Sequence, residues 1–66
     1  MSSKSLGMTI KRLRQQRKLT QEALAKRTGV HRVYIAQIEG RTKVPSIATL
    51  ERIAKALGVK PARLME

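Results

Sequence analysis

Helix-breaking residues recur at short intervals along the second half of this chain, and they limit the length of every element there. Gly29, Gly40, Pro45, Gly58 and Pro61 leave room only for short helices between them. The chain has 66 residues, a length suited to one small domain, and a single aromatic residue. Because aliphatic side chains and Met must then fill the interior, helix packing is favoured over a sheet. The sequence therefore predicts an all-α fold, a compact bundle of five short helices.

The start of the chain predicts a polar arm followed by the folded domain. Residues 1–5 are expected to form a flexible polar arm, and residues 6–66 a single domain. Ser5 is a candidate N-cap for a first helix that runs to about Arg17. Apolar residues recur at helical spacing along this first helix, at Leu6, Ile10 and Leu13.

Two helices joined by a tight turn are expected next. Thr20 is a candidate N-cap for the second helix, and Gly29 stands where a helix end often needs a left-handed residue. Only one residue separates Gly29 from the third helix, 31–39, which Gly40 ends. Helices joined so closely cross at a steep angle, and Ala25 supplies the small residue that lets their backbones approach. This segment therefore predicts a helix-turn-helix unit.

The last third of the chain predicts a basic loop and two more helices. Residues 41–45 form the loop, Ser46 caps the fourth helix, and Gly58 ends it. A final short helix is expected over 61–65, opened by a proline. The fourth helix carries an apolar stripe made of Ile47, Leu50, Ile53, Ala54 and Leu57.

The charge of the chain points to an anionic partner. Fifteen Lys and Arg residues stand against four Glu and no Asp, which gives a net charge of +11. Nucleic acid is the first candidate, an anionic membrane surface the second, and a merely soluble basic protein the remaining alternative. The helix breakers argue against the long amphipathic helix of a membrane-active peptide. One tyrosine offers no stacking platform for unpaired bases, so duplex DNA is favoured over RNA.

Catalysis is not expected from this composition. The chain has one His and no Cys, and its four Glu residues are scattered, so no nucleophile–base pair or paired acid is present. The same shortage argues against a metal site or any other cofactor. No small-molecule effector site is apparent. The sequence has neither a membrane-spanning segment nor a secretory signal, so a cytoplasmic location is expected.

Four stretches of the sequence resemble the lambda-repressor-like family, also called the Cro-type or XRE-type helix-turn-helix domain. They are LRQQRKLTQEALAKRTGV, YIAQIE, PSIATLERIAKALGV and PARLM, and together they span roughly residues 6–65. The resemblance implies a lambda-repressor-like bundle with the motif at helices 2 and 3. In that family the second helix of the motif lies in the major groove of DNA, and the first braces it.

The resemblance places four base-reading positions on the recognition helix, 31–39: His31, Arg32, Val33 and Gln37. Arg32 is suited to donate two hydrogen bonds to guanine, and Gln37 to pair with the edge of adenine. Val33 offers a methyl surface to thymine, although a valine on a short helix is also a core candidate. His31 stands at the N-cap, so a capping or a solvent-facing role remains open beside base reading.

The resemblance also implies contacts to the phosphate backbone and a structural ion pair. Arg14 and Glu39 match the family's arginine–glutamate pair, which ties the first helix to the recognition helix. The family more often has glycine one residue after Gly40, so Arg41 takes the usual glycine position here. The phosphate-contacting positions are Gln21, which also steadies a side chain of the recognition helix, Tyr34, Arg41, Lys43 and the region of Ser46.

The expected function is sequence-specific regulation of transcription, most simply repression. A homodimer on double-stranded DNA is expected to bind a roughly palindromic operator, with half-site centres about 34–36 Å apart. Leu64 and Met65 of the final helix are the expected dimer contact. The alternative is a DNA-binding antitoxin or another module that acts mainly through a partner protein such as a toxin.

Overall fold

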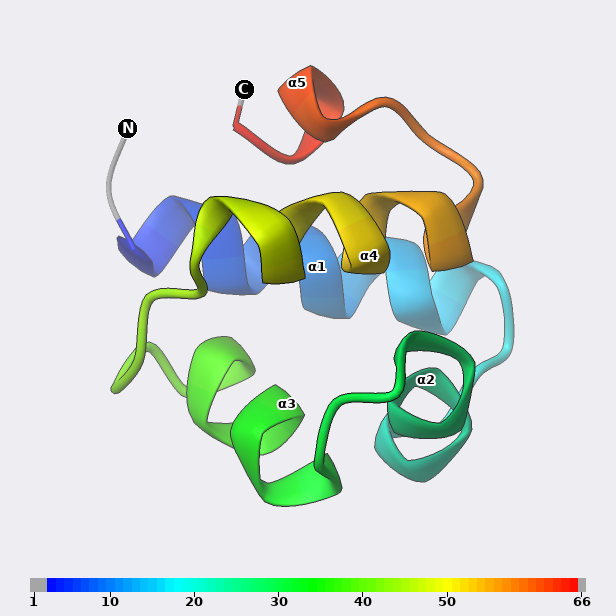
Figure 1. The fold of residues 1–66 in the computed structure, drawn as a ribbon. Coiled ribbons are helices and arrows are strands. Elements are labelled where there is room, and N and C mark those ends of the chain that lie inside the picture. Colours follow the sequence, from blue (N-terminus) through cyan, green and yellow to red (C-terminus); the bar gives the residue numbers. More distant parts are fainter. Residues whose placement is uncertain (1–2, 66) are drawn as a thin grey trace.

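The computed structural model describes residues 3–65. Its first and longest helix is α1 (Ser3–Gln16). Four shorter helices follow: α2 (Gln21–Thr28), α3 (Arg32–Glu39), α4 (Ile47–Leu57) and α5 (Pro61–Leu64). Figure 1 shows α2 and α3 together at one end of the molecule and α5 at the other. Residues 3–65 contain no strand, so the predicted all-α fold of five helices is confirmed.

Local signals in the sequence fix most of the helix ends. The hydroxyl of Thr20 accepts a hydrogen bond from the Ala23 N–H, which caps α2. Ser46 caps α4 in the same way, through the Thr49 N–H. Gly29 and Gly58 end α2 and α4 with φ angles of 73° and 72°, in the left-handed region that favours glycine.

The first helix begins earlier than expected. It starts at Ser3, so Ser5 lies inside α1 and is not its N-cap, and the expected arm over residues 1–5 is corrected at residues 3–5. Polar residues are tolerated in a first helical turn, because the backbone N–H groups there have no intrahelical partner to lose. The first two residues of the expected arm lie outside the described residues. At the other end of the chain, α5 stops at Leu64, one residue before the expected bound.

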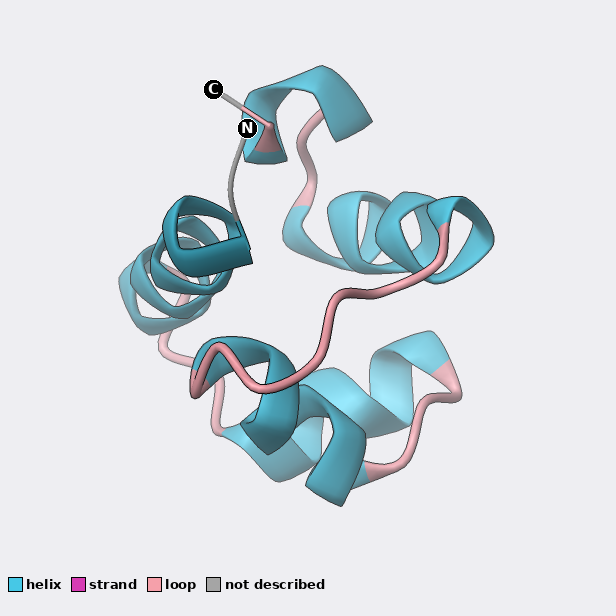
Figure 2. Cartoon of the chain, turned by 90° about the vertical axis from the view of Figure 1, so that its left-hand side faces the viewer, coloured by secondary structure: helices cyan, strands magenta, loops and turns pink. Residues whose placement is uncertain are grey.

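The five helices close around one aliphatic core. α2 packs against α3 and α4, α1 packs against α3 and α5, and α4 packs against α5. Figure 2 shows the helices surrounding a shared interior. No helix within residues 3–65 is long and apolar enough to cross a membrane. The buried apolar residues are Leu6, Ile10, Leu13, Leu24, Ala25, Ile35, Ile38, Leu50, Ile53, Ala54, Leu57 and Leu64.

Two apolar residues lie elsewhere than the sequence suggested. The helical period puts Ile47 in the apolar stripe of α4, but Ile47 is 75% exposed. It is the first residue of α4, and the helix enters the core only at Leu50, about one turn later. The sequence predicts Leu64 at a dimer contact, but none of its surface is exposed. Its side chain completes the core of its own chain, so it is not available to a partner.

Candidate nucleic-acid interface

The recognition helix presents one buried face and one exposed face. Ile35 and Ile38 point into the core, as the 3.6-residue period requires. Arg32 and Val33 are exposed, and Gln37 is half-buried. Val33 is 51% exposed, which excludes the alternative that this valine is a core residue. Three of the four predicted base-reading side chains therefore share the outer side of α3 or its border.

His31, the fourth predicted reader, is the N-cap of α3. Its Nδ1 accepts a hydrogen bond of 3.0 Å from the Val33 N–H, and its backbone is extended. The ring is exposed. The capping role that the sequence left open is thus present, and the residue also stands at the surface where α3 begins.

A buried ion pair holds α3 from its inner side. Arg14 donates from Nε and Nη2 to the two carboxylate oxygens of Glu39, at 2.6 and 2.9 Å, so the predicted pair is present. Nη1 of Arg14 also donates to the Leu19 carbonyl oxygen at 2.7 Å. The Gln21 amide donates to Oε1 of Glu39 at 3.1 Å. One carboxylate at the end of α3 therefore joins α1, α2 and α3.

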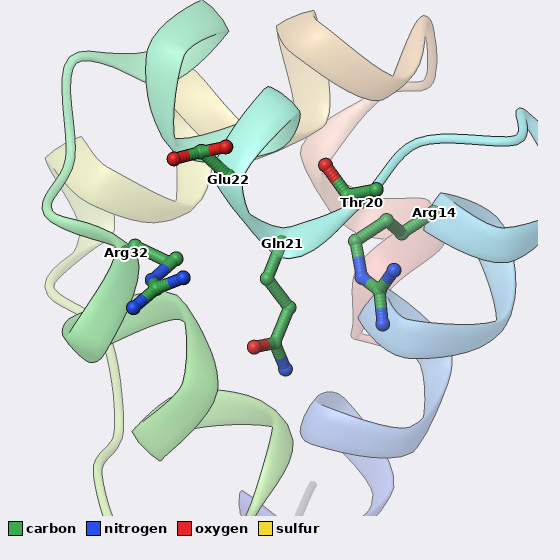
Figure 3. Close-up of a pocket in the computed structure, with 5 residues that line it drawn as sticks. All are labelled: Arg14, Thr20, Gln21, Glu22 and Arg32. Carbon is green, nitrogen blue, oxygen red and sulfur yellow. The ribbon is translucent and has the colours of Figure 1, made fainter.

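A hollow of about 430 Å³ opens beside this network, between the start of α2 and the start of α3. Figure 3 shows Arg14, Gln21 and Arg32 entering it from three different helices. Thr20 and Glu22 complete its lining. Each nitrogen of the Arg14 guanidinium already donates to Glu39 or to the Leu19 carbonyl oxygen. The donors of this lining that suit an anion such as a phosphate group are therefore Arg32 and the second amide N–H of Gln21.

The loop after α3 is anchored to the end of that helix. The Thr42 hydroxyl and backbone N–H both donate to the Gln37 carbonyl oxygen, at 3.1 and 2.9 Å, and the Lys43 N–H donates to the same oxygen at 3.3 Å. Arg41 has a φ of 67°, whereas Gly40 has a φ of −80°. Arg41, which stands at the usual glycine position of the motif, thus adopts the left-handed conformation that favours glycine.

Four of the predicted phosphate-contacting residues lie around this loop and helix. Arg41 and Lys43 are exposed, and Tyr34 is half-buried against the core. Ser46 closes the loop as the cap of α4. Sequence reasoning missed Thr42, because nothing local shows that its hydroxyl reaches back five residues. Within residues 3–65 no three His, Asp or Glu side chains gather closely enough to hold a metal ion.

Sequence reasoning also missed Gly7, a point where α1 lies tightly against the end of α3. A Cβ atom added at Gly7 would lie 2.4 Å from the Ile38 carbonyl oxygen and 3.4 Å from Cγ of Arg41. Only glycine allows α1 to approach α3 this closely. The available signal was a glycine inside a helical pattern, which costs stability relative to alanine and so points to a packing reason.

Helices α2 and α3, joined through Gly29 and Val30, together with the exposed polar face of α3, define a helix-turn-helix unit. The chain belongs to the helix-turn-helix family, whose model matches residues 10–64. The immunity repressor protein of Bacillus phage phi105 is 41% identical over 61 residues, which are 92% of this chain and 42% of the repressor. The control protein C.BamHI of Bacillus amyloliquefaciens is 44% identical over 48 residues, 73% of this chain and 59% of that protein.

The chain therefore spans about half the length of these two relatives. Among solved structures it is similar to the master regulator for biofilm formation SinR, solved in complex with DNA. The TM-score is 0.89 and the sequence identity 31%, over 92% of this chain and 98% of that one. The family is one of transcriptional regulators.

Proposed function

We propose that this chain is a transcriptional regulator that binds double-stranded DNA and reads the major groove with α3. The observation that carries the proposal is the construction of α3 itself. Glu39 fixes the helix from within through Arg14 and Gln21, while Arg32 and Val33 face outward. A rigidly held helix with free polar and methyl groups is what direct readout of base edges requires.

The outer face of α3 supplies the base contacts. Arg32 donates two hydrogen bonds to guanine, and Gln37 pairs with the edge of adenine. The methyl groups of Val33 contact the methyl group of thymine. Arg32 is the strongest candidate for a specificity determinant, because a bidentate contact discriminates by about 1–3 kcal/mol.

Phosphate contacts surround these readers and set the position of the helix. Gln21 and the hollow beside it receive one phosphate group, and Tyr34 contacts the backbone next to α3. Arg41, Lys43 and the backbone amides near Ser46 grip the phosphates on the other side of α3. These contacts contribute affinity and register with little sequence information.

Repression as a dimer on a roughly palindromic operator is the mode of action that we propose. The phage relative is named a repressor, and a repressor acts by occupying its site. The dimer contact lies at the end of α5, where Met65, the residue that follows the helix, is 44% exposed. A hollow of about 370 Å³ opens along the start of the same helix. Val59, Lys60, Ala62 and Arg63 line that hollow. Leu64 supports this surface from inside the core.

The test is selection of binding sites from a random duplex pool at about 150 mM salt, near physiological ionic strength. We expect an inverted repeat from the unaltered protein, and the same repeat with one relaxed guanine per half-site from Arg32→Ala. Arg12→Ala is the matched control, because Arg12 is exposed on α1 and should leave the selected motif unchanged. Recovery of no motif from the unaltered protein would overturn sequence-specific recognition.

A further inference from the structure

The single histidine of the chain is oriented by a hydrogen bond at the start of α3. Nδ1 of His31 accepts the Val33 N–H at 3.0 Å. A ring nitrogen that accepts a hydrogen bond carries no proton, and a neutral imidazole then carries its proton on the other nitrogen. The cap therefore fixes the tautomer: Nε2 bears the hydrogen and is a donor.

Capping alone does not account for a histidine at this position. Two other helices within residues 3–65 are capped by hydroxyl groups, α2 by Thr20 and α4 by Ser46. Ser, Thr, Asp and Asn are the preferred N-cap residues, and each of them caps with a short side chain. The imidazole of His31 caps with one nitrogen and carries a second polar atom on the far side of an exposed ring.

We propose that His31 donates its Nε2–H to a hydrogen-bond acceptor on the DNA in front of α3. This inference rests on the proposed function and specifies the chemistry of one of its contacts. The acceptor is either a base atom, such as N7 or O6 of guanine or O4 of thymine, or a phosphate oxygen. A cytosine or adenine amino group in that place would meet a second donor, so the contact disfavours it. Arg32, the next residue, donates to the same surface.

The cap also sets the direction of this donor before DNA binds. A ring held through Nδ1 has lost most of its rotational freedom, so little further conformational entropy is lost in the complex. The donor is thus oriented in advance, which a flexible side chain of similar reach would not achieve. Because the same ring caps α3, a hydrogen bond at Nε2 also helps to position the helix that carries Arg32, Val33 and Gln37.

The first arm of the test measures the tautomer without DNA. Long-range proton–nitrogen NMR spectra report which imidazole nitrogen is protonated, and a chain with one histidine gives one unambiguous set of signals. We expect a protonated Nε2 and an unprotonated Nδ1. A proton on Nδ1 would overturn the proposal, whatever the protein binds.

The second arm measures binding by His31→Ser, which keeps an N-cap oxygen and removes the donor. We expect unchanged thermal stability and about tenfold weaker binding to the selected DNA site. A loss confined to that site identifies a base atom as the acceptor, and an equal loss on a scrambled duplex identifies a phosphate oxygen. Equal affinities of His31→Ser and the unaltered protein would overturn the inference and leave the proposed function intact. An unaltered protein that selects no motif would instead overturn the proposed function.

Discussion

Arg14 on α1 donates to both carboxylate oxygens of Glu39, the last residue of α3, and the two side chains are only 10% and 3% exposed. A charge pair this buried does not stabilise a fold by a large margin, because desolvation offsets much of the attraction. It does penalise any arrangement in which the two groups separate. The orientation of α3 relative to α1 is therefore strongly specified.

Replacing Arg14 by Met should lower the free energy of unfolding by about 3–5 kcal/mol, because Glu39 is left buried without its cation. Urea denaturation followed by circular dichroism measures the loss. Arg12→Met, on the exposed side of the same helix, is the control and should leave stability unchanged. The double variant Arg14→Met with Glu39→Met should recover most of the loss. An Arg14→Met protein as stable as the unaltered chain would contradict this account.

Gly7→Ala should destabilise the protein although alanine favours helices. In an isolated helix the change would gain about 0.5–1 kcal/mol. Here the new Cβ would meet the backbone oxygen of Ile38 at 2.4 Å, so we expect a net loss of about 1–3 kcal/mol and weaker DNA binding. Thermal unfolding and DNA titration measure the two effects. Met8→Ala, at a 55% exposed neighbour, is the control. A stabilised Gly7→Ala protein would refute the close contact.

Two basic residues outside the helices have left-handed backbones, Lys18 with a φ of 56° and Arg41 with a φ of 67°. Glycine relieves a strain of about 1 kcal/mol at such positions, so Lys18→Gly and Arg41→Gly should both raise the melting temperature. Only Arg41→Gly should weaken DNA binding, and it should reduce the salt dependence by about 0.9 in log–log slope. If the two variants bound DNA alike, the phosphate contact assigned to Arg41 would be wrong.

The two neighbouring residues at the end of α5 should separate folding from dimerisation. Leu64→Ala empties a core position and should cost about 2–5 kcal/mol of stability. Met65→Ala should leave the stability of the monomer nearly unchanged and weaken the dimer on DNA. Chemical denaturation and sedimentation velocity, with and without the selected site, distinguish these outcomes. A Met65→Ala protein that dimerises normally would move the dimer contact away from α5.

Much of the fold could be predicted because its determinants are local. Helix caps and helix ends depend on residues within a few positions of one another, so they can be predicted from the local sequence. The examples here are Thr20, Ser46, Gly29 and Gly58. The start of α1 differs from the predicted cap at Ser5, because serine is common both at caps and inside a first turn. Local signals of this kind determine the presence of a helix better than its first residue.

Contacts between distant segments were harder to predict. Ile47 continues the period of α4, yet a helix buries only the turns that lie over the core, and periodicity does not reveal where the core ends. Leu64 has the same apolar character whether it packs inward or against a partner. The Arg14–Glu39 ion pair could be predicted only from the family resemblance. The contact between Gly7 and Ile38 depends on how two helices cross, which no short stretch of sequence encodes.

The residues that hold α3 and the residues that α3 displays are different residues. Ile35, Ile38 and Glu39 fix the helix, and Gln37 anchors the following loop only through its backbone oxygen, which any amino acid supplies. Substitutions at Arg32, Val33 or Gln37 can therefore accumulate in descendants of this protein without weakening the fold. The binding preference and the fold can then evolve at different rates. Replacing a few exposed side chains is enough to change the DNA sequence that the protein binds.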